Sequence, residues 1–180
     1  MAHIDTSEIV RAFLWLKPAG DALERIQKLA RSLHKEGGGP LVPPHVTLLT
    51  GAETTRANAE LKLKHLATRL RPFRLKLGKI ESREEYFRAF YAVVEANGDL
   101  AAAQREAYDV FEMNPPPPYE PHLSLLYGKL DAGMKKKLAD EAGGKLDVAF
   151  EVHTLYLVNS TQSVPVSDWH TLAEHELTGT

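Results

Sequence analysis

Two short stretches of the chain are nearly the same, and each carries a histidine and a hydroxyl residue. "PHVTLLTG" (44–51) and "PHLSLLYG" (121–128) have proline, histidine, two leucines and glycine at matching positions. Two further positions are conservative, with valine matched by leucine and threonine matched by serine. A histidine and a hydroxyl at the same spacing in both copies predict that the two stretches share one chemical role.

Both stretches are predicted to be strands, because prolines precede them and a glycine follows. Alternate side chains of a strand lie on one face, so each histidine shares a face with the hydroxyl two residues later. The Cα atoms of such a pair are about 6.6 Å apart, which lets both groups contact one phosphate. The residues expected to face the core instead are Val46, Leu48, Leu123 and Leu125.

The four polar side chains would act together if the two copies meet about a pseudo-two-fold axis. Histidine titrates at about pH 6.5, so one member of a close pair can accept a proton while the other donates one. Opening a cyclic phosphate needs both acts, since water must lose a proton and the leaving alkoxide must gain one. Hydroxyl groups would donate hydrogen bonds to the non-bridging oxygens, where charge develops. Which histidine is the base stays open.

The pattern His-apolar-Thr/Ser-apolar, present twice, resembles the signature of the two-histidine phosphoesterase superfamily. In detail the chain resembles the cyclic phosphodiesterase branch of plants and fungi. Landmarks of that branch occur in its order over nearly the whole chain: "AFLWLKP", "VPPHVTL", "EYFRAFY", "PYEPHLSLLYG" and "DWHTLAEHEL".

The resemblance implies that the protein hydrolyses ADP-ribose 1",2"-cyclic phosphate and nucleoside 2',3'-cyclic phosphates, with no metal and no other cofactor. It gives His45 and His122 the roles of acid and base, and Thr47 and Ser124 the binding of phosphate. It also places Tyr127 near the site. Some plant relatives look disulfide-stabilised, whereas this chain has no cysteine. That difference bears on stability or compartment and not on the reaction.

Large aromatic residues are usually part of the core, and Trp15, Tyr86, Phe87 and Trp169 are most simply placed there. A nucleotide base or ribose nevertheless needs a surface on which to stack. The resemblance favours Trp15 and Phe87 as substrate-binding residues. Because Tyr86 and Phe87 are expected in one strand, they would point to opposite faces.

Composition limits the classes of molecule that the protein is expected to bind. A formal net charge of −2 over 180 residues gives no basic field for long nucleic acid, so a small nucleotide substrate is expected rather than a duplex. No apolar run is long enough to span a membrane, and we expect a monomeric cytoplasmic protein. The other histidines have no metal-ligand spacing and are expected to be structural or exposed: His3, His34, His65, His153, His170 and His175.

Hydrophobic periodicity predicts one α+β domain over 1–180 with the order β-α-β-α-β-β-α-β-α-β-β. Duplicated βαβ-type units would form two lobes, whose antiparallel or mixed sheets share a central cleft. The predicted helices are 20–39, 55–70, 97–112 and 131–144, with Asp21 and Glu24 capping the first and Asp99 the third. The predicted strands are 10–16, 43–51, 73–80, 86–96, 122–128, 149–158 and 168–177.

Two other functions stay open. An enzyme of the same superfamily that acts on RNA ends, such as a 2'-5' RNA ligase-like protein, would be expected to have basic residues flanking the motifs, and the flanks here are uncharged or acidic. A non-catalytic nucleotide-binding protein would not need both histidines and both hydroxyls. The proline run 115–118 is more simply a stiff loop than a polyproline ligand, and the lysines at 135–137 a solvated helix face.

Overall fold

The computed structural model describes residues 5–115 and 118–180. Over these residues the chain forms four α-helices, α1 (Gly20–Gly37), α2 (Arg56–Arg69), α3 (Gly98–Val110) and α4 (Ala132–Ala142). The strands are β1 (Ile9–Leu16), β2 (Val46–Thr55), β3 (Phe73–Glu81), β4 (Phe90–Val94), β5 (His122–Leu126), β6 (Lys145–Val152), β7 (Thr154–Asn159) and β8 (His170–Glu176). Each repeated strand follows one helix and precedes another, as predicted. His3 and the middle of the proline run 115–118 lie outside the described residues.

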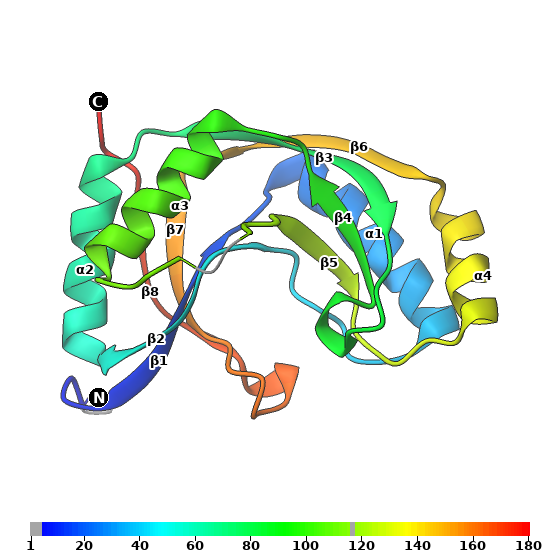
Figure 1. Ribbon diagram of the computed structural model, residues 1–180, viewed down its shortest axis with the longest axis horizontal. Helices are drawn as coiled ribbons and strands as arrows, with labels where there is room; N and C mark the ends of the chain where they lie inside the picture. Colours follow the sequence, from blue (N-terminus) through cyan, green and yellow to red (C-terminus); the bar gives the residue numbers. More distant parts are fainter. Residues whose placement is uncertain (1–4, 116–117) are drawn as a thin grey trace.

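All the described strands form one antiparallel sheet in the order β6-β3-β4-β5-β2-β1-β7-β8. The two expected sheets are therefore halves of one sheet, joined where Val46 of β2 pairs with Leu123 of β5. Helices α1 and α4 contact strands of the half that ends in β6, and α2 contacts strands of the half that ends in β8 (Figure 1). Helix α3 packs against α2 and contacts both β2 and β3. The α+β architecture with an antiparallel sheet is thus confirmed.

The core takes the apolar side chains that strand parity assigns to it. Val46, Leu48, Leu123 and Leu125 are all buried. One hydrophobic cluster includes these residues together with apolar residues of every other strand except β8. Each fully buried leucine or valine contributes about 1.5 to 3 kcal/mol to folding. The burial fixes the register of both repeated strands, since a slip by one residue would turn their apolar side chains to the opposite face.

Three predicted strands are wrong in extent. The expected strand 43–51 does not end at Gly51 but continues through it to Thr55 as β2. The expected strand 149–158 is the end of β6 and the start of β7, separated by His153. The division arises because β6 pairs with β3 and β7 pairs with β1, which belong to different halves of the sheet. The expected strand 86–96 begins as a single 3₁₀ turn, Tyr86–Arg88, and becomes strand β4 only at Phe90.

The predicted helix caps are also wrong. Helix α3 is capped by Asn97, whose side-chain oxygen accepts from the Leu100 N–H at 2.9 Å, and Asp99 lies in the first turn. Helix α1 starts after Ala19 with no side-chain cap, so Asp21 and Glu24 do not form a capping pair. Asp21 still places a negative charge in the first turn, where the helix dipole favours it.

Within the described residues no helix is long and apolar enough to cross a membrane.

Candidate active site

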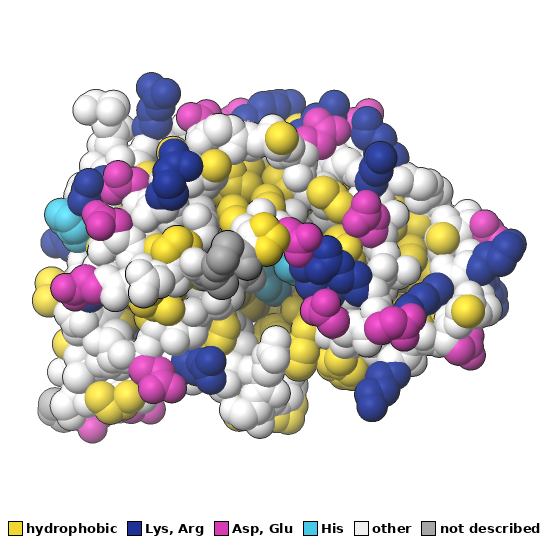
Figure 2. All heavy atoms as spheres, viewed as in Figure 1, with side chains coloured by type: hydrophobic (Ala, Val, Ile, Leu, Met, Phe, Trp, Pro, Cys, Tyr) yellow, Lys and Arg dark blue, Asp and Glu magenta, His cyan; other side chains and the backbone are white. Residues whose placement is uncertain are grey.

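The two repeated strands converge on one cavity of about 210 Å³. Figure 2 shows a hollow near the middle of this face, with histidine atoms inside it and Lys or Arg side chains at its edge. All the side chains predicted from sequence to serve the site line this cavity: Trp15, His45, Thr47, Phe87, His122, Ser124 and Tyr127.

The strand pairing explains why the four motif side chains meet. Strands β2 and β5 are antiparallel and share the Val46–Leu123 pair. In antiparallel pairing the flanking positions are also opposite, so each histidine faces the hydroxyl residue of the other copy. Because Val46 and Leu123 point into the core, the histidines and hydroxyls lie on the opposite, cavity side.

Both histidines are oriented by the same local contact. His45 Nδ1 lies 2.6 Å from the carbonyl oxygen of Pro43, and His122 Nδ1 lies 2.9 Å from the carbonyl oxygen of Glu120. A carbonyl only accepts, so Nδ1 carries the proton in each ring and donates it. This leaves Nε2 of each histidine without a proton when the ring is neutral, as a general base requires.

Burial disfavours the charged form of both rings. The pKa of His45 is lowered to about 4, chiefly by burial and further by the charges of His122 and Lys17, while the bond to Pro43 opposes the shift. Burial also lowers the pKa of His122. The bond to the Glu120 carbonyl opposes that shift, and Arg88 and Arg83 add to it. Near pH 7 both histidines are therefore neutral in the free protein.

Trp15 supports His45 directly. The two rings are stacked, with centroids 3.5 Å apart and planes 6° from parallel. One face of the indole is thus covered by the imidazole, and Trp15 as a whole is only 3% exposed. The Lys17 ammonium lies 5.8 Å from the Trp15 ring centroid and 4.1 Å from that of Tyr156. Besides lining the cavity, Trp15 fixes the plane of His45.

Each motif strand forms a hydrogen bond with another part of the protein at its hydroxyl residue. The Ser124 hydroxyl donates to the carbonyl oxygen of Phe87 at 3.2 Å, so it must turn to bind a ligand. The Tyr119 hydroxyl donates a hydrogen bond to the backbone carbonyl of Thr47 at 3.0 Å, and the Thr47 residue lines the cavity. The two copies thus hold their hydroxyl residues in different ways.

An aromatic wall closes one side of the cavity. Tyr127 contacts Phe87 edge-on at 5.1 Å between centroids and Trp169 edge-on at 6.0 Å. Burial raises the pKa of Tyr127, so its phenol stays protonated. Trp169, expected in the core, instead lines the cavity, and Tyr86 is 40% exposed, so its expected core position is also wrong. In the 3₁₀ turn Tyr86 and Phe87 do not alternate across a strand, and Phe87 is the one that lines the cavity.

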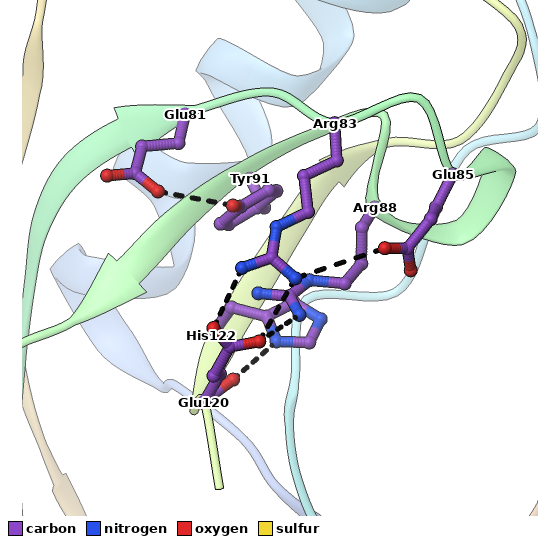
Figure 3. Close-up of polar contacts among 7 residues, drawn as sticks. All are labelled: Glu81, Arg83, Glu85, Arg88, Tyr91, Glu120 and His122. Carbon is purple, nitrogen blue, oxygen red and sulfur yellow. Dashed lines mark hydrogen bonds and ion pairs between the residues drawn. The ribbon is translucent and has the colours of Figure 1, made fainter. Parts of the chain in front are cut away.

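No pattern in the sequence pointed to Arg88, which lines the cavity beside His122. Its Nη1 donates to Glu120 Oε2 at 2.9 Å, and its guanidinium lies 4.7 Å from the Tyr91 ring centroid (Figure 3). Arg88 ends the 3₁₀ turn before β4, and β4 pairs with β5, the strand that begins at His122. Only this non-local pairing could have identified it. Other cavity residues that the sequence did not indicate are Phe13, Thr50, Glu85, Ser160 and Gln162.

The remaining histidines lie elsewhere. Of those in the described chain, none other than the motif pair lines the cavity. Residues 5–115 and 118–180 contain no group of three or more His, Cys, Asp or Glu side chains arranged to hold a metal ion.

Comparisons with known proteins identify related sequences and folds. The chain is 26% identical over 165 residues to the cyclic phosphodiesterase of Arabidopsis thaliana, covering 89% of this chain and 91% of the relative. Its fold matches Escherichia coli LigT complexed with 3'-AMP, with TM-score 0.68, 17% identity and coverage of 95% and 99%. The LigT structure with phosphate gives TM-score 0.65, 20% identity and coverage of 96% and 99%. Residues 11–163 match the model of the 2'-5' RNA ligase superfamily, and the chain therefore belongs to that family.

Proposed function

We propose that this protein is a cyclic phosphodiesterase that works by two-histidine acid–base catalysis without a metal. Its proposed reactions convert nucleoside 2',3'-cyclic phosphates to nucleoside 2'-phosphates and ADP-ribose 1",2"-cyclic phosphate to ADP-ribose 1"-phosphate. The observation that carries the proposal is the convergence of both motif histidines and both motif hydroxyls on one cavity. The 26% identity to a cyclic phosphodiesterase over nearly the full length supports the same reaction class.

The proposed reaction uses the free Nε2 atoms of the two rings. One neutral histidine takes a proton from water, and the water oxygen attacks phosphorus. The bond from phosphorus to the 3' oxygen breaks, and the other histidine, in its protonated form, gives its proton to that oxygen. A 2'-phosphate and a free 3' hydroxyl result, and the proton gained by the base returns the pair to its starting charge.

The acid must take up its proton from solvent when the substrate binds. Both histidines have a lowered pKa in the free protein, so neither is charged near pH 7. A bound phosphate anion favours the charged imidazolium and raises the pKa of the histidine beside it. Substrate binding thus produces the pair that catalysis needs, with one histidine neutral and the other protonated.

The other predicted site residues are proposed to contact the substrate or to support His45. Thr47 and Ser124 donate hydrogen bonds to the non-bridging phosphate oxygens, where a single lost donor typically lowers kcat by about 10²-fold or more. Tyr127 and Phe87 present aromatic surface to the base or ribose, and Trp15 keeps His45 in plane.

The test is turnover with defined substrates. Purified protein in EDTA is incubated with adenosine 2',3'-cyclic phosphate, with ADP-ribose 1",2"-cyclic phosphate, and with an oligonucleotide that ends in the same cyclic phosphate. Hydrolysis of the first two to the 2'- and 1"-phosphates is expected. Strong preference for the oligonucleotide would favour the RNA-end function instead. Tight calorimetric binding with no product would favour a nucleotide-binding protein.

A further inference from the structure

The cavity contains one fixed positive charge. Attack on a cyclic phosphate adds negative charge to the non-bridging oxygens, and preorganised donors and cations aimed at such charge usually make the largest single contribution to catalysis. The motif histidines are neutral in the free protein, and the motif hydroxyls carry only dipoles. Of the described residues that line the cavity, Arg88 is the one lysine or arginine.

Arg88 lies where two cavities meet. A second cavity of about 200 Å³ shares Thr47, Thr50, Arg88 and His122 with the first. The Arg88 side chain is 15% exposed, so its charge acts in a partly dehydrated place where electrostatic interactions are stronger than in water. An anion held between Thr47 and His122 would lie next to this guanidinium.

The protein uses only part of the hydrogen-bonding capacity of Arg88. Within the described residues Arg88 Nη1 donates to Glu120, while Nε is buried and has no partner. A guanidinium has five N–H donors, and buried polar donors are normally paired. A phosphate oxygen in the cavity would supply an acceptor for a fork that the protein leaves incompletely bonded.

Arg83 provides a comparison within the same cluster. It donates to Glu120 through Nη1 at 3.0 Å and Nη2 at 2.8 Å, so its fork is occupied by the carboxylate. Its side chain is 35% exposed, and it lines neither of the two cavities. Figure 3 shows both arginines reaching toward Glu120, with His122 beside Arg88.

We propose that Arg88 binds the phosphate of the substrate directly, and that Glu120 and Tyr91 hold its guanidinium in place for this contact. The proposal rests on the phosphate chemistry assigned to this cavity above. Glu120 contacts one Nη and Tyr91 lies against the guanidinium, so the fork is ordered before the substrate arrives. An ordered arginine fork binds phosphate oxygens more strongly than a mobile ammonium group does.

The experiment compares Arg88→Met with Arg83→Met. Methionine keeps an apolar stem against Tyr91 and removes the guanidinium. Binding of 2'-AMP and of inorganic phosphate is measured by calorimetry, and kcat/KM is measured with adenosine 2',3'-cyclic phosphate. Arg88→Met is expected to weaken binding of both anions about tenfold or more and to lower kcat/KM by about 10²-fold. Arg83→Met is expected to change either quantity by no more than about fivefold, as is usual for an exposed ion pair.

Unchanged anion binding in Arg88→Met overturns the proposal. So does an equal loss in both variants, because Arg88 would then act only by holding Glu120. If Arg88→Met does not fold, Arg88→Lys is measured in its place; it keeps the charge but not the fork, and affinity equal to that of the wild type overturns the proposal.

Failure of the proposed function gives a different result. If binding of 2'-AMP depends on Arg88 but no cyclic phosphate is turned over, the role of Arg88 in phosphate binding is supported and the proposed reaction is refuted. Full turnover by Arg88→Met would support the proposed reaction and refute the role of Arg88.

Discussion

Replacing His45 with glutamine should reduce the amount of stability that the protein loses on acidification. His45 is almost fully buried, and burial lowers its pKa to about 4 from the ordinary value of 6.5. Between these two pH values the unfolded chain binds a proton that the folded protein does not bind. The free energy of unfolding therefore falls as the pH falls through this window, and the contribution of His45 to that fall is absent from the variant.

The size of the effect follows from the two pKa values. Between pH 7 and pH 4.5 the linkage of this single group removes about 2 kcal/mol from the stability of the wild-type protein. The pH 4.5 limit avoids most of the stability that is lost when carboxylates with a lowered folded-state pKa are protonated, because that loss only begins near their unfolded-state pKa of about 4. Glu120, for example, has a pKa lowered to about 2 by Arg83 and Arg88.

The assay is urea unfolding of both proteins at pH 7 and pH 4.5. His45→Gln is expected to be less stable at pH 7, because the stacking with Trp15 is lost, but to lose about 2 kcal/mol less than the wild type on acidification. His170→Gln is a matched control. His170 Nδ1 contacts the carbonyl oxygen of Asp168 at 3.0 Å in the same way, but His170 is exposed. Equal acid sensitivity of the wild type and His45→Gln would refute the reasoning.

Three further predictions follow from the same geometry. The profile of kcat/KM against pH should be bell-shaped with an acid limb near pH 4 and an alkaline limb below pH 6.5, and a maximum above pH 7 would contradict the lowered pKa of both motif histidines. Trp15→Ala should expose His45, raise its pKa and move the acid limb to higher pH, and an unmoved limb in a folded variant would show that the stacking does not set the pKa. Gly39→Ala should destabilise the protein in thermal unfolding more than Gly38→Ala does. Both glycines have positive φ, but only at Gly39 would a Cβ overlap a neighbour, the Tyr127 carbonyl oxygen. Equal losses of stability in the two variants would contradict this close approach of Gly39 to Tyr127.

Much of the fold could be predicted from local patterns. The alternation of apolar and polar residues in the repeated strands correctly assigned Val46 and Leu123 to the core and so determined which face carries the histidines. Helix stripes such as Ile26, Ala30 and Leu33 were likewise visible in the sequence. These features depend on neighbours along the chain, and each has a period that matches one secondary structure.

Features that depend on distant partners could not be predicted. The division of 149–158 into two strands arises because consecutive residues pair with β3 and with β1 at opposite parts of the sheet. The position of Arg88 depends on the pairing of β4 with β5, and no local pattern distinguishes it from Arg83. The stacking of Trp15 on His45 depends on the register of β1 against β2, in which Trp15 is opposite Thr47.

The central claim is that both motif histidines perform the chemistry. The most direct measurement follows adenosine 2',3'-cyclic phosphate by phosphorus NMR, in EDTA, with the wild type, His45→Gln and His122→Gln. The wild type is predicted to give the 2'-phosphate alone, and each folded variant is predicted to lose about 10²-fold or more in rate. Either variant turning over at nearly the wild-type rate, in preparations free of contaminating nuclease, would contradict the claim.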